Sequence, residues 1–281
     1  MIEVRIGGSI EKPYHNPEEW YALVKELGYR AVLFPVMADA PLPEREAYLA
    51  CIKEHDLVIG EVGAWSNPMD PDEEKRREAI GYCIKQLQYA EELGANCCVN
   101  IAGSRMQKWD GCCAENYTKD TYALIVDTVR EIIDAVNPMR TFYTLEPMPW
   151  MVPSSPEEYL KLIADIDRKG FGVHLDFTNM INCPERFVHR DAFIEECFRK
   201  LGPYIKSVHG KDVVMTDDLP CVIKETMPGR GAVDYQKVVK LCEGLGPDTT
   251  LFVEHLPDFE SYKEAAFYVR EQALKAGVTL V

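Results

Sequence analysis

Basic residues are few for the length of this chain. Against 46 Asp and Glu there are 31 Lys and Arg among 281 residues, which leaves a formal net charge of −15. Polyanions are normally bound by faces rich in Lys and Arg, so this balance argues against nucleic acid and anionic membrane surfaces as partners. A local basic groove would still be compatible with it. Histidine is also scarce, with six residues in all, which disfavours a site built from many imidazoles.

Long hydrophobic runs are missing as well. No stretch of about 18 apolar residues indicates a membrane span, and Glu3 and Arg5 interrupt the start where a signal peptide would need an apolar core. The ten cysteines contain no C-x-x-C pair, so neither a zinc ribbon nor a thioredoxin-type redox motif is indicated. From these absences we expect a reduced, soluble, cytoplasmic protein.

What the chain does contain is a regular alternation of β-like runs and amphipathic helical stretches. Eight strands are expected, at Glu3–Ser9, Ala31–Val36, Leu57–Ala64, Asn96–Ala102, Thr141–Pro147, Gly172–Thr178, Ile205–Lys211 and Leu251–His255. Eight helices are expected, at Pro17–Leu27, Pro43–His55, Asp72–Leu93, Asn116–Ala135, Pro156–Arg168, Asp191–Leu201, Tyr235–Glu243 and Phe259–Ala276. Helix-ending glycines are expected at Gly28, Gly94, Gly170, Gly202 and Gly277.

Eight βα units of about 35 residues each (281/8) predict an α/β protein with a single (β/α)8 barrel. No Gly-rich dinucleotide fingerprint follows the first expected strand, which weakens the alternative of an open doubly wound sheet. No linker divides the chain, so residues 1–281 are expected to form one domain. Two segments without clear structure, Gly103–Glu115 and Val213–Gly231, follow strands and are expected on the catalytic face.

Four polar residues stand near the carboxyl ends of four successive expected strands: Glu146, Asp176, His209 and Glu254. Barrel enzymes build their sites at these strand ends, and alternation lets one side chain per strand converge on a point. Three converging carboxylates would repel one another unless a cation neutralised them. Carboxylates with one imidazole suit Mn²⁺, Mg²⁺, Co²⁺ or Zn²⁺. Each residue alone is as readily explained as a helix cap, an ion-pair partner or a core histidine, but the set of four predicts a metal site.

At these residues the sequence resembles the xylose isomerase-like barrels. That superfamily comprises sugar isomerases, ketose 3-epimerases, inosose-processing enzymes, hydroxypyruvate isomerases and endonuclease IV-type repair nucleases. The resemblance covers essentially the whole chain and is carried by LEP at 145–147, HLDFTNM at 174–180, VHGKD at 208–212, PGRGAVDY at 228–235 and FVEH at 252–255. It implies one divalent metal, Mn²⁺ first among the candidates, held by Glu146, Asp176, His209 and Glu254.

The chemistry that the resemblance implies is proton transfer beside a carbonyl. A metal that chelates a carbonyl and the neighbouring hydroxyl acidifies the adjacent C–H and stabilises the enediolate oxygen. In the ketose-epimerase branch the two glutamates, here Glu146 and Glu254, act as acid and base. Return of the proton to the opposite face gives epimerisation, and return to the neighbouring carbon gives isomerisation. We therefore expect a carbohydrate-metabolising isomerase or epimerase of a ketose or keto-polyol, assembled as a homo-dimer or homo-tetramer.

Two departures from the family pattern bear on the substrate. Asn179 stands three residues after Asp176, where both the repair nucleases and the ketose 3-epimerases carry a histidine. The ends of the third and fourth strands offer Gly63, Trp65, Asn100 and Ser104 in place of the additional histidines that a trinuclear zinc cluster requires. A nuclease is therefore disfavoured, and the identity of the sugar stays open.

Candidates for substrate contact are His174, Lys211, Arg230, Trp65 and Trp109. His174 is two residues before Asp176 and is expected on the same inward face. It suits a role in orienting Asp176, contact with the substrate or a place in the core. Lys211 is two residues after His209, so its side chain is expected to point inward as well. It suits either contact with a substrate oxygen or a position at the barrel rim. Arg230 lies between glycines in a loop that would receive a phosphate, although PGRG is no phosphate signature. The tryptophans suit stacking on a sugar ring or closure of the barrel mouth.

Two other functions stay open at the level of sequence. A metal-dependent dehydratase or lyase acting on a keto-sugar or inosose begins with the same proton abstraction. A barrel without activity would serve as a binding subunit of a complex. His255 alternates outward from Glu254, so a structural role is favoured for it.

Overall fold

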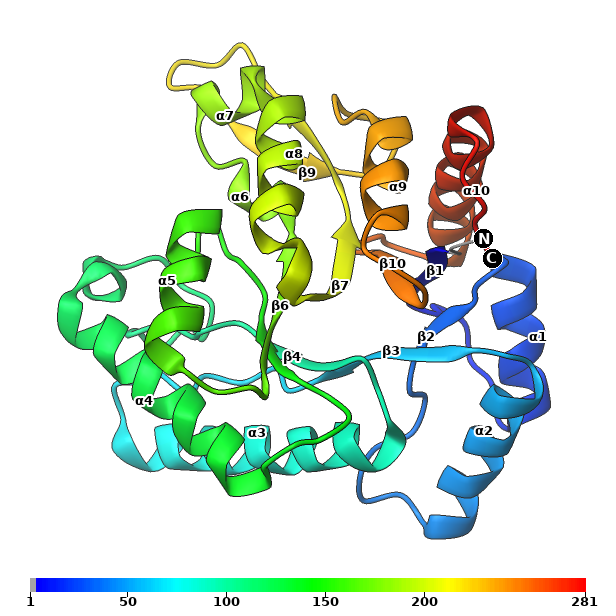
Figure 1. Cartoon of the computed structure of the whole chain (residues 1–281), viewed down its shortest axis with the longest axis horizontal. Coiled ribbons are helices and arrows are strands. Elements are labelled where there is room, and N and C mark those ends of the chain that lie inside the picture. The colour runs from blue at the N-terminus through cyan, green and yellow to red at the C-terminus, as the bar shows by residue number, and fades with distance from the viewer. Residues whose placement is uncertain (1–3) are drawn as a thin grey trace. The chain divides into compact units, whose positions relative to one another are not determined.

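The computed structural model describes residues 4–281, and Glu3, the first residue of the first expected strand, lies outside the described residues. Eight parallel strands form one sheet in the order β1-β10-β7-β6-β5-β4-β3-β2 (Figure 1). Their bounds are β1 Val4–Gly8, β2 Ala31–Leu33, β3 Val58–Gly63, β4 Cys97–Asn100, β5 Tyr143–Leu145, β6 Phe171–Asp176, β7 Ile205–Gly210 and β10 Thr249–Val253. Because each strand is followed by at least one helix, the fold is a (β/α)8 barrel, which confirms the predicted fold class.

The main helices lie close to the expected ranges. They are α1 Pro17–Leu27, α2 Leu42–Glu54, α3 Glu73–Leu93, α4 Lys119–Val136, α5 Pro156–Ile166, α8 Arg190–Leu201, α9 Tyr235–Glu243 and α10 Phe259–Ala276. Shorter helices that the sequence pattern does not predict are α6 Phe177–Met180, α7 Pro184–Val188, η1 Ala114–Tyr117 and η2 Gly202–Tyr204. Within residues 4–281, every helix is too short or too polar to cross a membrane.

Three of the five expected glycine caps are confirmed. Gly28, Gly94 and Gly277 end their helices with φ of 72°, 70° and 73°, a region that glycine enters without a Cβ clash. The predictions for Gly170 and Gly202 are wrong. Helix α5 ends earlier, at Asp167 with φ of 47°, because aspartate is one of the few residues that tolerate this backbone conformation, and Gly202 begins η2.

The described chain divides into two compact units. The first unit comprises the chain up to Gly60, Asp176–Phe198 and Ser207–Val281. Within it, β1 pairs in parallel with β10, and β10 pairs in parallel with β7. The strand side chains Ile6, Val208 and Leu251 are fully buried here, so this part of the sheet has an apolar core of its own.

The second unit comprises Glu61–Leu175 and Arg199–Lys206. Within it, β4 pairs in parallel with β3 and with β5, and β5 pairs with β6, in a register that sets Leu145 opposite Val173. All four residues of β4 are buried, as expected for a central parallel strand covered on both faces. That residues 1–281 form one domain stays a prediction.

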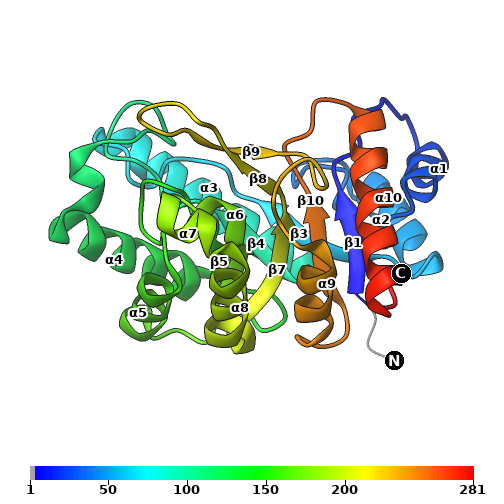
Figure 2. The same ribbon diagram turned by 90° about the horizontal axis from the view of Figure 1, so that it is seen from above.

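A β-hairpin follows β7 directly (Figure 2). It consists of β8 Asp212–Met215 and β9 Ile223–Thr226, which pair antiparallel from Asp212 opposite Thr226 to Met215 opposite Ile223. The expectation that Val213–Gly231 lacks clear structure is therefore wrong for much of this segment. The hairpin belongs to the first unit and adds two strands to the eight of the barrel.

Candidate active site

Asp176 is fully buried at the end of β6 and uses its two carboxylate oxygens differently. Its Oδ1 accepts a hydrogen bond of 2.8 Å from the backbone N–H of Asn179 and so caps helix α6. Its Oδ2 lies 2.8 Å from Nζ of Lys211 and 3.9 Å from Nδ1 of His209. The cap fixes the orientation of the carboxylate, which directs the second oxygen toward these two side chains.

His209 and Glu254 meet Asp176 in the first unit. Nδ1 of His209 lies 2.8 Å from Oε2 of Glu254, and each of the three side chains offers a ligand atom within 4.8 Å of the others. Two ligands of one first-row ion, each about 2.0–2.2 Å from it, lie at most about 4.4 Å apart. The measured separations of 2.8 and 3.9 Å fall within that limit. Two carboxylates and an imidazole therefore fit a divalent cation in both spacing and chemistry.

Lys211 lies among the same oxygens and is only 1% exposed. Its ammonium lies 2.8 Å from Asp176 and 2.9 Å from Glu254. The backbone carbonyl of Lys211 accepts hydrogen bonds from the Thr178 and Tyr235 hydroxyls, which fix this stretch of chain. The side chain of Lys211 thus points inward, as the alternation of side chains along the strand predicts, and it does not lie at the rim of the barrel.

Glu254 is held in its charged form. Burial alone would raise its pKa, but the neighbouring charges of His209, Lys211 and His255 hold the pKa of Glu254 well below its usual range. A carboxylate that stays ionised is suited to bind a cation.

His255, for which outward parity favours a structural role, lies beside the carboxylates of the site. Its φ of 55° places a non-glycine residue in the left-handed region, and such backbone conformations cluster at functional sites. Its Nδ1 lies 3.1 Å from the carboxylate of Glu225 on β9, and its Nε2 lies 3.4 Å from Glu254. The left-handed backbone turns the imidazole back toward the carboxylates.

A cavity of about 320 Å³ opens beside these residues in the first unit. Its polar wall comes from Lys211, Glu225, Glu254 and His255, and its apolar wall includes Met227 and Leu256. Glu225 is a residue that the sequence does not single out, because it lies on the hairpin and not at the end of a barrel strand. The cavity gives a small molecule access to the carboxylate of Glu254.

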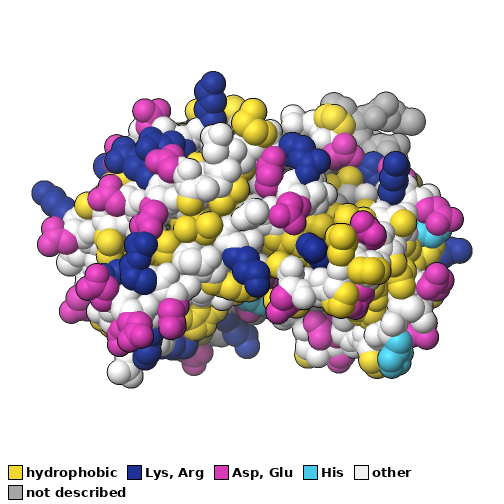
Figure 3. Space-filling model, turned by 90° about the horizontal axis from the view of Figure 1, so that it is seen from below, with side chains coloured by type: hydrophobic (Ala, Val, Ile, Leu, Met, Phe, Trp, Pro, Cys, Tyr) yellow, Lys and Arg dark blue, Asp and Glu magenta, His cyan; other side chains and the backbone are white. Residues whose placement is uncertain are grey.

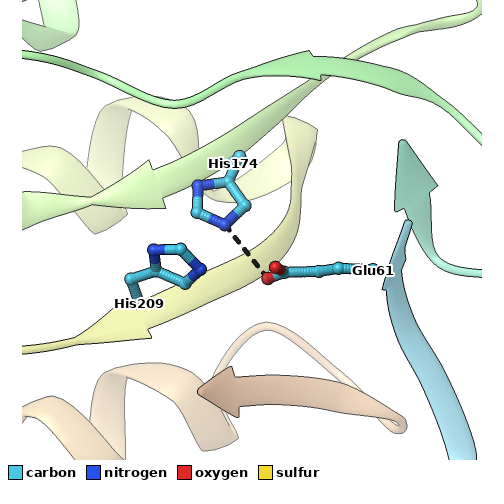
Figure 4. A group of neighbouring side chains, drawn as sticks. All are labelled: Glu61, His174 and His209. Atoms are coloured by element: carbon cyan, nitrogen blue, oxygen red, sulfur yellow. Dashed lines mark hydrogen bonds and ion pairs between the residues drawn. The ribbon is translucent and has the colours of Figure 1, made fainter. Parts of the chain in front are cut away.

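In the second unit, a buried pair links β3 to β6. Oε1 of Glu61 lies 3.0 Å from Nε2 of His174, and both side chains are buried (Figure 4). This contact gives His174 a buried partner, as a core histidine needs, and contact of His174 with a substrate stays a prediction. Glu61 is missed by sequence reasoning, although a lone acid within the strand Val58–Gly63 was a usable signal.

Glu146 is buried in the second unit, directly after β5. Its backbone N–H donates a hydrogen bond of 2.7 Å to the carbonyl of Asn100, which continues the pairing of β5 with β4. Because Leu145 lies opposite Val173, the same parallel register sets Glu146 level with His174 on β6. Glu146 thus follows the strand end as the sequence predicts.

The remaining candidates lie at the surface. In the first unit, the exposed guanidinium of Arg230 pairs with Glu264 at 2.6 Å, and Arg230 is not among the described residues that line the cavity. In the second unit, Trp65 and Trp109 are exposed. Their stacking on a sugar stays a prediction.

Comparison with known proteins identifies the family. The sequence pattern described as xylose isomerase-like TIM barrel matches residues 21–272. The chain belongs to this family. The match spans nearly all of the chain, as the sequence resemblance predicts, so the family assignment is confirmed.

Solved structures of several other proteins share the fold. A protein from Mycobacterium smegmatis in complex with magnesium is 17% identical, with a TM-score of 0.68 over 98% of this chain and 97% of its own. D-psicose 3-epimerase from Clostridium cellulolyticum H10 is 15% identical, with a TM-score of 0.69 over 99% and 100% of the two chains. The probable 3-DHS dehydratase AsbF from Bacillus anthracis is 16% identical, with a TM-score of 0.72 over 98% and 99%. At this identity the likeness shows the fold alone.

Proposed function

We propose that this xylose isomerase-like barrel is a divalent-metal-dependent isomerase or epimerase of a ketose or keto-polyol. The observation that carries the proposal is the convergence of Asp176, His209 and Glu254, whose ligand atoms lie within 4.8 Å of one another in the first unit. The structural likeness to D-psicose 3-epimerase and to a magnesium complex supports it. Mn²⁺ is the ion that we propose first.

Glu146 is the fourth ligand in this proposal. It follows β5, which is the neighbour of β6 in the sheet, and its register places it level with His174, two residues before Asp176. In a parallel sheet the carboxyl ends of neighbouring strands share one edge, where the active sites of barrels lie.

The two glutamates are the proposed acid and base. A bound divalent ion would polarise the carbonyl and neighbouring hydroxyl of the substrate and acidify the C–H between them. One of the two glutamates, Glu146 or Glu254, accepts that proton, and the other returns it. Lys211, which lies 2.9 Å from Glu254, donates a hydrogen bond to a substrate oxygen and orients it. The guanidinium of Arg230 pairs with Glu264, and contact of Arg230 with a substrate stays a prediction.

Hydrogen exchange tests the reaction. We expect the metal-loaded protein, incubated in deuterated buffer with a panel of ketoses and keto-polyols, to exchange the proton next to the carbonyl, as seen by NMR. Glu146→Gln and Glu254→Gln should each lower the exchange rate at least about a hundredfold, because general acid–base groups contribute 10²–10⁴-fold. Near-wild-type exchange in either variant would exclude that glutamate as acid or base.

The same spectra distinguish the alternatives. Loss of water from the substrate would identify β-elimination, the reaction type suggested by the likeness to a probable dehydratase. No exchange and no elimination with any compound of the panel would contradict the enzymatic proposal and favour a non-catalytic barrel subunit.

We further infer a cytoplasmic location. All ten cysteines are free, which is usual for proteins kept in a reducing compartment. Assembly into a homo-dimer or homo-tetramer stays a prediction.

A further inference from the structure

We propose that the cavity beside Glu254 is a subsite for an uncharged monosaccharide or polyol, and that Glu225 of the β8–β9 hairpin selects this substrate by accepting a hydrogen bond from a hydroxyl. The inference rests on the proposed function and deepens it, because the family resemblance leaves open whether the substrate carries a phosphate or a carboxylate.

The charges around the cavity oppose an anionic ligand. Both basic side chains that line it face carboxylates: Nζ of Lys211 lies 3.4 Å from Glu225 and 2.9 Å from Glu254, and Nδ1 of His255 lies 3.1 Å from Glu225. A phosphate placed here would meet two carboxylates, beside basic groups that already have carboxylate partners. Burial of a charge without a partner is costly, so an anion binds poorly at such a wall.

The same wall suits hydroxyl groups. A hydroxyl donates one hydrogen bond and accepts others, and the cavity offers the Glu225 carboxylate as acceptor within 3.4 Å of the Lys211 ammonium as donor. Glu225 is 44% exposed, so one side of its carboxylate remains open to a ligand. Met227 and Leu256 supply an apolar surface for the C–H face of a sugar.

The size of the cavity favours one sugar unit. Ligand pockets span about 300–1,000 Å³, and the volume of about 320 Å³ lies at the lower end of that range. Glu225 lies opposite Val213 in the hairpin β8–β9, and this hairpin lies between β7 and α9 in the chain. The selecting group therefore comes from a segment inserted into the βα alternation. The hairpin therefore provides a specificity element that the barrel strands do not supply.

Binding measurements test this assignment directly. The probes are D-fructose and D-ribulose, each compared with its terminal phosphate ester, and 2-keto-D-gluconate as a carboxylate. We expect isothermal titration to show tighter binding of at least one uncharged sugar than of its phosphate ester and of the carboxylate. Equal or tighter binding of the charged compounds, or binding of neither uncharged sugar, would overturn the inference.

Variants identify the selecting residue. Glu225→Gln should weaken binding of the uncharged sugar about tenfold or more, the effect of one hydrogen bond to a charged group. Glu225→Lys should shift the preference toward the phosphate ester. The matched control is Glu131→Gln, which removes an equally exposed carboxylate that pairs with Arg77 in the second unit. Wild-type selectivity in both Glu225 variants would also overturn the inference.

Mn²⁺ titration in the same experiment separates the two proposals. If Mn²⁺ binds but the phosphate ester is preferred, the subsite assignment fails and the proposed function stands. If Mn²⁺ does not bind while the preference for the uncharged sugar persists and depends on Glu225, the proposed function fails and the subsite assignment stands.

Discussion

At the scale of single residues, Lys211 is a buried charge that lies among three carboxylates. A buried ammonium is costly unless carboxylates compensate it, and removal of one partner leaves the others buried and uncompensated. Here the ammonium lies within 3.4 Å of Asp176, Glu225 and Glu254. It therefore provides the positive charge that keeps these carboxylates together when no metal ion is bound.

Replacement of Lys211 tests this role. Lys211→Met should lower the free energy of unfolding of the metal-free protein by about 3–5 kcal/mol, because the carboxylates then repel one another. Added Mn²⁺ should recover most of that loss, so the rise in melting temperature on metal addition should be larger than in the wild type. Urea unfolding and thermal melts with EDTA or Mn²⁺ provide the measurement.

Lys237→Met is the control for that experiment, since it removes a more exposed lysine that pairs with Glu195 at 2.7 Å. A Lys211→Met protein with wild-type stability in EDTA would show that the ammonium does not hold the carboxylates together.

The residues of the candidate site differ in how far the sequence predicts them. Asp176, His209 and Glu254 follow apolar runs at strand ends, so periodicity and strand order are enough to select them. Glu225 and Glu61 give no such signal, because each acquires its partner, His255 or His174, only through tertiary packing. The metal-binding role of the strand-end residues stays a prediction.

At the scale of elements, the hairpin β8–β9 and the loop after it are held by one buried side chain. Oδ2 of Asp212 accepts hydrogen bonds of 3.0 Å from the backbone N–H groups of Gly229 and Gly231. Its Oδ1 accepts from Val213 at 2.8 Å and Val233 at 2.9 Å. A Cβ atom on Gly231 would lie 2.3 Å from Oδ1, so this position requires glycine. Asp212 thus anchors the segment that carries Glu225.

Asp212→Asn tests the anchor. Either orientation of the amide turns an NH₂ group toward two N–H donors, so we expect a loss of about 3 kcal/mol in the free energy of unfolding, measured in urea. Asp218→Asn, which changes an exposed hairpin carboxylate bonded to Thr216, should have little effect. Equal stability of the two variants would contradict the anchoring role.

The elements themselves are largely predictable, with two informative exceptions. Helix α4 begins at Lys119 and not at Asn116, because Thr118 caps it and the preceding turn forms η1. The hairpin escapes prediction because its strands are only four residues long and pair antiparallel outside the βα alternation. Short strands of this kind depend on partners that the local pattern does not reveal.

At the scale of the whole molecule, part of the excess of acidic residues is explained by the candidate site. Three of the 46 acids, Asp176, Glu254 and Glu225, have a carboxylate within 3.4 Å of the Lys211 ammonium. On the face drawn in Figure 3, Lys and Arg side chains are scattered among Asp and Glu side chains and form no continuous basic stripe among the described residues. Nucleic acid binding depends on such a stripe, so the absence of nucleic acid as a partner stays our prediction.

The central claim is that Asp176, His209 and Glu254, with Glu146, bind one divalent ion. Titration of the chelator-treated protein with Mn²⁺, followed by calorimetry, tests it most directly. We expect one ion per chain in the wild type and in Glu131→Gln. In Asp176→Asn the amide oxygen can still accept the hydrogen bond from the backbone N–H of Asn179 and so preserve the cap of α6. That variant should nevertheless bind on the order of a hundredfold more weakly, because loss of a ligand exceeds the 10–100-fold effect of outer groups. No binding by the wild type, or equal binding by Asp176→Asn, would contradict the claim.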